Sequence, residues 1–286
     1  NIVKLIMLPV QIRRIKSISK KNPSLIFHAH TTYYMLLCWL AKIKFIGTPM
    51  GSEILVRPNK SRVYKFFSIK SLLAAKHITV DSVNMQNRIL QLCGRESTVI
   101  QNGINISAIS EVVNNLKERK NIVSIRAIHP LYRIDEIFKA RVHTIEKPCI
   151  NFIYPYWEDH YKAKIAKNFI PDDKDLGRIS RDKMYELLSS AKLVISIPES
   201  DSSPRSVYEA IFCGCCVVVT YNPWIDALPD CMKSRLFIVD LNDILWLQKA
   251  LDHADLIVKQ PYAPSEIALN LFDQRKSMQI IANSFY

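Results

Sequence analysis

Short runs of apolar and β-branched residues alternate with segments of helical periodicity along most of the chain. Such runs are typical of strands buried on both faces, and the segments between them are typical of amphipathic helices. We expect strands at 25–30, 45–47, 78–80, 98–100, 122–125, 151–154, 175–180, 193–197, 215–219 and 236–239. We expect helices at 10–19, 32–41, 57–76, 85–93, 181–190, 205–212 and 243–253. This alternation predicts an α/β fold built on parallel sheets.

The segment 191–220 shows the pattern most clearly. A buried strand ends at Pro198, and a polar loop leads to a helix that is expected to end at Gly214. Pro204 fits the first turn of that helix, and Ser202 or Ser203 is expected to cap it. The loop therefore lies at the carboxyl edge of a parallel sheet, where open α/β sheets bind ligands.

Composition narrows the class of protein. The 286 residues are 49% hydrophobic and 23% charged, which is typical of a globular chain long enough for two domains. No apolar run is long enough to span a membrane, and the first apolar residues precede rather than follow the positive charges, unlike a secretory signal. Three of the seven cysteines, Cys213, Cys215 and Cys216, cluster in buried-strand sequence, so we expect reduced core thiols and a cytoplasmic protein without a metal site.

Positive charge is concentrated in the first third of the chain. Residues 1–105 contain 16 of the 39 Lys and Arg but only three of the 26 Asp and Glu, so they carry the whole net charge of +13. Basic helical segments lie at 3–19 and 57–76, the second with Tyr64, Phe66 and Phe67. An anionic membrane surface is the expected partner, and a merely soluble basic face is the alternative. No nucleic-acid-binding module accompanies the charge, so nucleic acid is not expected.

Two carboxylates flank the loop before the 205–212 helix. Asp201 and Glu209 are eight positions apart, and Glu209 is followed by Ala210 and, four residues later, Gly214. This spacing resembles the acidic-x7-acidic signature of family 4 retaining glycosyltransferases, in which the first acid is usually Glu. The alternative is a loop Asp that caps the helix and a solvated helical Glu.

Further matches extend the resemblance from about residue 22 to 258. Asn102-Gly103-Ile104-Asn105 is similar to the end of the family's first domain, and Arg126 stands where members hold the donor diphosphate. Members often have a Lys shortly after that Arg, and here Arg133 is the candidate replacement. The resemblance implies a GT-B fold, two Rossmann-like domains facing a cleft, with the first domain shortened at its N-terminus. We expect domains at 1–105 and 106–262, a linker at 106–120 and a helical tail at 263–286 that crosses back to the first domain.

The resemblance also implies a donor site in the second domain. Glu209 would bind the ribose hydroxyls, Asp201 the sugar hydroxyls, and Arg126 the leaving diphosphate. The catalytic candidates are thus Asp201, Arg126 and Glu209. The donor-binding candidates are Arg126, Arg133, Gly177, Arg178, Ile179, Ser202, Ser203, Arg205, Ser206, Val207 and Glu209.

Acceptor-side candidates lie in the first domain. They are His30, at the end of a strand, and the loop residues Gly51, Ser52 and Glu53. We expect His28 and His30 to point to opposite faces of their strand, and therefore not to form a metal pair. Met50 stands where many members have His or Trp, so no histidine role is carried over. Simple loop packing is the alternative for 51–53.

The implied activity is transfer of a sugar, with retention, from a UDP- or GDP-sugar to a hydroxyl acceptor, without a metal or other cofactor. A lipid-linked glycan of bacterial surface polysaccharide synthesis is the expected acceptor, and the basic domain would associate peripherally with the inner face of the membrane. A catalytically silent GT-B-like scaffold is the alternative.

Overall fold

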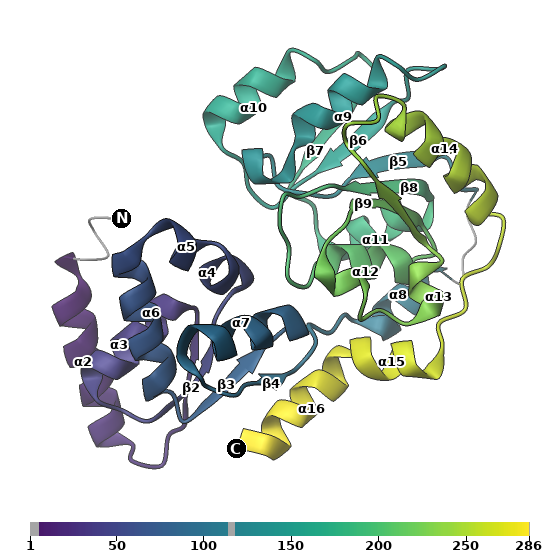
Figure 1. Ribbon diagram of the computed structural model, residues 1–286. Coiled ribbons are helices and arrows are strands. Elements are labelled where there is room, and N and C mark those ends of the chain that lie inside the picture. Colours follow the sequence, from purple (N-terminus) through teal and green to yellow (C-terminus); the bar gives the residue numbers. More distant parts are fainter. Residues whose placement is uncertain (1–5, 114–117, 286) are drawn as a thin grey trace. The chain divides into compact units, whose positions relative to one another are not determined.

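The computed structural model describes residues 6–113 and 118–285 (Figure 1). The chain divides into two compact units, residues 1–102 with 277–286 and residues 103–276. The expected domains were 1–105 and 106–262, and the expected tail at 263–286 is shared between the units. Residues 114–117 of the expected linker, and 3–5 of the expected basic segment 3–19, lie outside the described residues.

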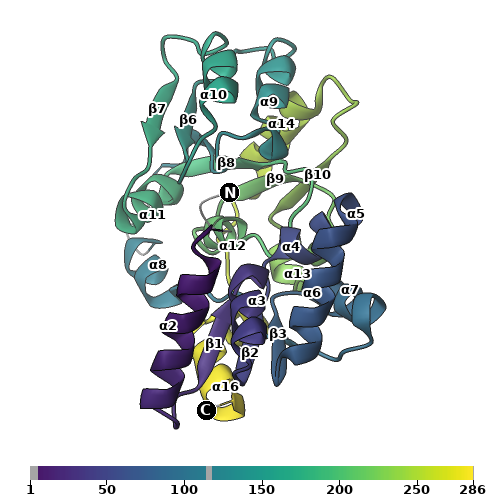
Figure 2. The same cartoon turned by 90° about the vertical axis from the view of Figure 1, so that its left-hand side faces the viewer.

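The first unit contains a four-stranded parallel sheet in the order β1-β2-β3-β4. Its strands are β1 (Phe27–His30), β2 (Phe45–Thr48), β3 (His77–Val80) and β4 (Thr98–Val99). Its helices are α2 (Leu8–Lys21), α3 (Thr32–Ala41), α4 (Gly51–Leu55), α5 (Arg57–Lys60), α6 (Arg62–Ala74) and α7 (Val83–Cys93). Helices α2, α3 and α6 pack side by side (Figure 2).

Local chemistry explains where the first unit departs from the expected element bounds. Helix α2 begins at Leu8, before the predicted start, because Pro9 fits the first helical turn. Ser61 divides the predicted 57–76 helix, and its hydroxyl accepts a hydrogen bond from Tyr64 N at 3.2 Å to cap α6. Strand β1 begins at Phe27 rather than Leu25, and the Leu25 side chain is exposed.

The second unit contains a six-stranded parallel sheet in the order β10-β9-β8-β5-β6-β7. Its strands are β5 (Asn121–Ser124), β6 (Ile150–Ile153), β7 (Lys174–Gly177), β8 (Ala191–Ser196), β9 (Cys216–Thr220) and β10 (Leu236–Val239). Its helices are α8 (Ile106–Val113), α9 (Ile134–Arg141), α10 (Asp159–Ala166), α11 (Arg181–Ser189), α12 (Arg205–Phe212), α13 (Asp230–Lys233), α14 (Trp246–Ile257) and α15 (Glu266–Phe272). Two short 3-10 turns, η1 (Pro130–Tyr132) and η2 (Pro223–Ile225), and helix α16 (Gln274–Phe285) complete the chain.

The four central strands of the second unit, β5, β6, β8 and β9, are buried on both faces, as their continuous apolar runs predict, whereas the edge strand β7 is largely exposed. In β8, Val194 packs into one core, which contains residues of α11, α12 and α15. Its neighbours Leu193 and Ile195 pack into the other core, with residues of α9, α10 and α14. Successive strand residues point to opposite faces, so a single apolar run supplies both cores.

The strand order of the second unit reverses at β5. The chain runs from β5 outward through β6 to β7, then returns to β8 on the other side of β5 and continues to β9 and β10. Strands β5 and β8 are neighbours, and the loops that follow them lead in opposite directions along the sheet, one toward β6 and the other toward β9. Such a switch point is where open α/β sheets form their ligand crevice.

Candidate functional site

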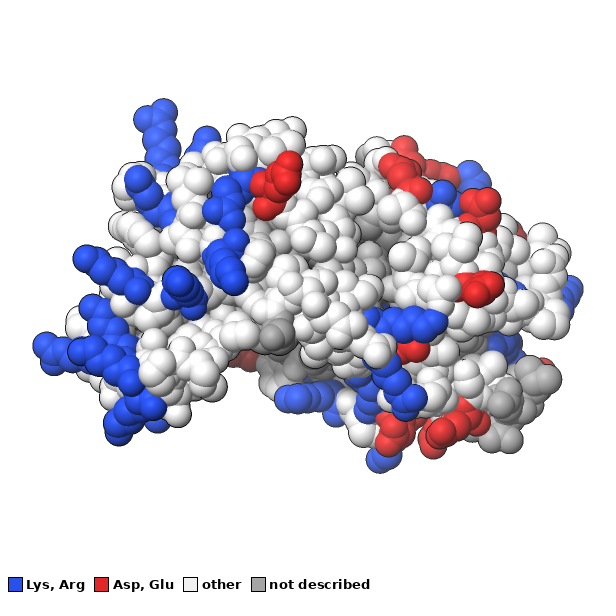
Figure 3. All heavy atoms as spheres, turned by 90° about the horizontal axis from the view of Figure 1, so that it is seen from below, with Lys and Arg blue, Asp and Glu red and all other residues white. Residues whose placement is uncertain are grey.

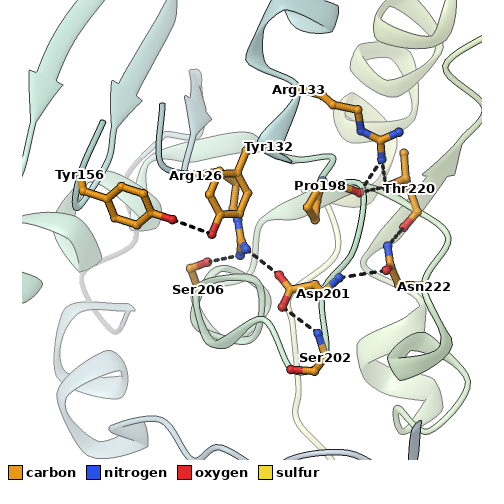
Figure 4. A network of polar contacts seen from close by, with 10 residues as sticks. All are labelled: Arg126, Tyr132, Arg133, Tyr156, Pro198, Asp201, Ser202, Ser206, Thr220 and Asn222. Atoms are coloured by element: carbon orange, nitrogen blue, oxygen red, sulfur yellow. Dashed lines mark hydrogen bonds and ion pairs between the residues drawn. The ribbon is translucent and has the colours of Figure 1, made fainter. Parts of the chain in front are cut away.

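Arg126 and Asp201 meet at this switch point (Figure 4). Arg126 follows β5 and Asp201 lies in the loop after β8, and the Arg126 Nη2 to Asp201 Oδ2 distance is 2.6 Å. Their side chains are only 12% and 15% exposed, so the pair is largely removed from water. Ser206 of α12 joins them, because its Oγ accepts a hydrogen bond from Arg126 Nη1 at 3.3 Å. The structure thus brings together three of the predicted donor-site residues.

Asp201 is held by its own loop as well as by Arg126. Its Oδ1 accepts a hydrogen bond from Ser202 N at 2.9 Å, and its backbone N–H donates to Asn222 Oδ1 at 3.1 Å. Asn222 follows β9, and its Nδ2 donates to the Thr220 carbonyl. This chain of bonds fixes the Asp201 carboxylate against the Arg126 guanidinium.

Two tyrosines extend the Arg126 cluster. The Arg126 guanidinium carbon lies 4.6 Å from the centre of the Tyr132 ring, a cation–π contact, and the Tyr132 and Tyr156 hydroxyl oxygens are 3.2 Å apart. Burial and the neighbouring hydroxyl raise the pKa of Tyr156 to about 12, so the Tyr156 phenol is neutral at pH 7. Sequence reasoning missed both tyrosines, although Tyr156 follows the carboxyl end of β6, which was an available signal.

Helix α12 directs its first turn toward this cluster. Its N-cap residue is Pro204, rather than the expected Ser202 or Ser203, which precede it. Both serines are buried in the loop. The Val207 N–H is used within the turn, where it donates to the Pro204 carbonyl, and its side chain is in the core.

Glu209 lies on α12, and its side chain is 3% exposed. Its Oε1 accepts a hydrogen bond from the Tyr185 hydroxyl at 3.0 Å and lies 3.6 Å from Arg205 Nε and 3.8 Å from Arg181 Nε. Burial raises the pKa of Glu209, and the two guanidinium groups oppose that shift. This environment contradicts the alternative of a solvated helical Glu. Tyr185 and Arg181 of α11 were not predicted.

Arg133 has a different environment from Arg126. Its Nε donates to the Ile197 carbonyl at 2.9 Å, and its Nη2 donates to the Pro198 carbonyl and to Thr220 Oγ1. Desolvation by burial lowers the pKa of Arg133, and the nearby Glu199 and Glu136 carboxylates oppose that shift. The guanidinium thus ties the ends of β8 and β9 together (Figure 4).

The remaining predicted donor-site residues lie at the end of β7. Gly177 has a φ of +60°, which favours glycine, and its carbonyl accepts a hydrogen bond from Tyr154 N. Arg178 is exposed, and Ile179 packs partly against the unit's core. No contact joins these residues to Arg126 in the described part of the unit.

The acceptor-side candidates lie at the carboxyl edge of the first unit's sheet. Glu53 is buried, and its Oε2 accepts hydrogen bonds from Thr32 N at 2.8 Å and Met50 N at 3.1 Å. It therefore joins the β1–α3 loop to the start of α4, as the packing alternative expected. Gly51 and Ser52 occupy the first turn of α4, and Ser52 is exposed.

The two histidines of β1 share one face of the strand. The rings of His28 and His30 are stacked with their centres 4.3 Å apart, so the expectation of opposite faces is wrong. The reason is the period of two in a strand, which places residues i and i+2 on the same face. His28 Nε2 lies 2.7 Å from Thr48 Oγ1, and His30 is exposed at the strand end. Among the described residues, no three His, Cys, Asp or Glu side chains are grouped to hold a metal.

Comparison with solved structures identifies the fold. HepE from Anabaena, solved with UDP and glucose, matches with a TM-score of 0.76 at 16% identity, over 96% of this chain and 80% of that one. The chain has the GT-B fold. Sucrose-phosphate synthase from Thermosynechococcus elongatus matches with a TM-score of 0.68 at 13% identity, over 97% and 77% of the two chains. A glycosyltransferase from Rickettsia africae matches with a TM-score of 0.69 at 14% identity, over 98% and 80%.

These neighbours confirm the predicted fold class, two α/β units with parallel sheets. No protein-family model and no curated protein matches the sequence. The similarity to the solved structures is therefore one of fold. In the described ranges 6–113 and 118–285, no helix is both long and apolar enough to cross a bilayer.

Proposed function

We propose that this protein is a glycosyltransferase that takes a sugar from a nucleotide-diphospho-sugar bound by its second unit. The observation that carries the proposal is the Arg126–Asp201–Ser206 cluster at the strand-order switch point, beside the first turn of α12. A guanidinium and the N-terminus of a helix are suited to a diphosphate. HepE, which shares the fold, was solved with UDP-glucose.

We assign the chemical roles as follows. Arg126 and the α12 N-terminus stabilise the negative charge that develops on the leaving diphosphate, without a metal ion. Glu209 accepts hydrogen bonds from the ribose hydroxyls, since a fixed carboxylate has acceptor sites for two donors. Asp201 orients Arg126 and the sugar. Arg133 shapes the loop rather than binding phosphate, because its Nε and Nη2 donate to the Ile197 and Pro198 carbonyls.

The finer proposal is transfer with retention by front-face attack, so no protein nucleophile is assigned. The donor is a UDP- or GDP-sugar, and the acceptor is a hydroxyl of a lipid-linked glycan in bacterial surface polysaccharide synthesis. His30, Gly51 and Ser52 are the acceptor-side candidates. The protein would work in the cytoplasm, peripherally bound at the inner face of the membrane.

A catalytically silent scaffold is the second candidate. It is favoured by one observation, namely that Asp201 neutralises Arg126 and that Glu209 is already surrounded by Tyr185 and two arginines. In a scaffold, these groups would stabilise the loops by contacting one another and would bind no donor.

A thermal-shift panel of UDP, GDP, ADP and CMP separates the two. A transferase is stabilised by its own nucleotide through mass action, by about 2.7 kcal/mol at a hundredfold excess over Kd. Arg126→Ala and Glu209→Ala should lose that shift. The matched control is Arg141→Ala, because Arg141 is buried in an ion pair with Asp173 outside this cluster. It should lower the melting temperature yet keep the shift. No shift with any nucleotide in the wild type would favour the scaffold.

A further inference from the structure

We propose that the outer face of α6, continued by the end of α3, docks on an anionic lipid bilayer. We define the α6 face as the outward residues Val63, Phe66, Phe67, Lys70 and Leu73. The inference names the surface for the peripheral membrane binding proposed above and is separate from the nucleotide chemistry, because every residue of this face belongs to the first unit.

Apolar side chains on the α6 face point into solvent. Val63 is 68% exposed and Phe66 is 54% exposed, and Phe67 and Leu73 are also exposed. Buried positions of the same helix, Ser68, Ser71 and Leu72, lie on its other side and include two serines. Helix α6 thus exposes its largest apolar side chains, Phe66 and Phe67, and buries two polar serines. A contiguous exposed patch of this kind is typical of an interaction surface.

The patch continues into a shallow apolar pocket. The Phe67 ring lies 6.5 Å from the ring of Trp39 on α3. Trp39, Leu40 and Ile43 line a pocket of about 350 Å³ together with Lys42 and Ala74. The pocket adjoins the α6 face, so the surface that enters the bilayer would include residues of both α3 and α6.

Positive charge surrounds these apolar groups. Lys70 Nζ lies 5.6 Å from the centre of the Phe66 ring, Lys65 is exposed on the same helix, and Lys42 lines the pocket. Neither α3 nor α6 contains an acidic residue. Figure 3 shows Lys and Arg crowded over the first unit, with few acidic side chains among them. The few carboxylates of residues 1–105 include Glu53, which is buried and hydrogen-bonded.

Lipid chemistry matches this combination. Aromatic and aliphatic side chains enter the boundary between head groups and acyl chains, while lysines keep their ammonium groups at the anionic head groups. Each basic residue near such a surface strengthens binding by about fivefold. A soluble acidic partner would use the lysines but would not require the exposed Phe66 and Phe67.

Flotation of the purified chain with lipid vesicles tests the proposal. The wild type should float with phosphatidylcholine–phosphatidylglycerol vesicles and not with phosphatidylcholine alone. Phe66→Ser/Phe67→Ser and Lys65→Gln/Lys70→Gln should each weaken binding by at least about tenfold. The matched controls lie on the second unit. Ile145→Ser/Leu256→Ser removes two exposed apolar groups, and Lys147→Gln/Lys167→Gln removes two exposed charges, and neither should change binding.

A second readout tests insertion directly. Vesicles with brominated acyl chains should quench the fluorescence of Trp39, and Trp39→Phe should lose that part of the quenching. Nucleotide binding and the melting temperature should be unchanged in all the vesicle variants, which separates this proposal from the donor site. Wild-type chain that stays with the soluble fraction, equal binding to neutral vesicles, or α6 variants that bind like the controls would each overturn it.

Discussion

The ion pair between Arg126 and Asp201 makes a prediction about stability that does not depend on any ligand. It joins the ends of two strands that are neighbours only because of the strand order. We expect Asp201→Asn to lower the free energy of unfolding by about 2 kcal/mol. Loss of one partner of a fully buried pair costs about 3–5 kcal/mol, and a charged hydrogen bond contributes about 1.5–3 kcal/mol. Both side chains are slightly exposed, so we expect a loss of stability nearer the smaller of these two ranges.

A double-mutant cycle measures the interaction itself. Arg126→Gln, Asp201→Asn and the double variant should show a coupling energy of about 1.5–2 kcal/mol in denaturant unfolding followed by tryptophan fluorescence. Trp224 and Trp246 are buried in the second unit and report on it. The control is the ion pair of Lys192 and Asp255, 2.9 Å apart with Asp255 54% exposed. Its cycle with Lys192→Gln and Asp255→Asn should give less than about 1 kcal/mol.

Additive effects of the Arg126 and Asp201 substitutions would refute the reasoning, because residues in a shielded ion pair must couple. A control cycle as large as the test cycle would also refute it. In that case burial at the switch point would not explain the strength of the pair.

Three other substitutions test separate environments in the structure. Glu209→Gln should abolish nucleotide stabilisation. It should also reduce the fall of melting temperature as pH rises above about 4.5, because burial raises the pKa of Glu209 and the native state is destabilised as pH rises through that raised pKa; an unchanged pH profile would contradict this. Burial, and then the neighbouring His30, lower the pKa of His28, so stability should fall as pH drops below about 6.5, and His28→Gln should flatten that decline in a thermal melt. Gly214→Ala should lower the free energy of unfolding more than Gly94→Ala in denaturant unfolding. Both glycines have a positive φ, which costs a residue with a Cβ about 1 kcal/mol, but only a Cβ at position 214 would meet Arg119 Nη2, at 2.7 Å. Equal costs would contradict the close contact.

Local sequence pattern was enough to predict most elements of the second unit. The buried run before Pro198 and the glycine after α12 predicted β8 and the end of the helix, because those features depend on neighbouring residues. Arg126 and Glu209 could be selected for the same reason, together with the family resemblance. Their assignment to the donor stays a prediction.

Contacts between distant segments could not be predicted in this way. The pairing of Asp201 with Arg126 requires β8 to lie beside β5, and Tyr185 reaches Glu209 only because α11 packs near α12. Neither arrangement is written in a run of neighbouring residues. His28 and His30 are a different case, since the strand period alone predicts their shared face when it is applied correctly.

Hydrogen–deuterium exchange with a nucleotide-sugar tests the central claim most directly, because it locates the bound donor on the chain. With UDP-glucose, or the GDP-sugar if GDP gives the shift, we predict slower exchange at 126–132 and 199–209, the loops of the switch point and the first turn of α12. The 145–149 loop serves as an internal reference and should not change. Protection confined to other segments, or none at a concentration that stabilises the protein, would contradict a donor site at Arg126 and Glu209.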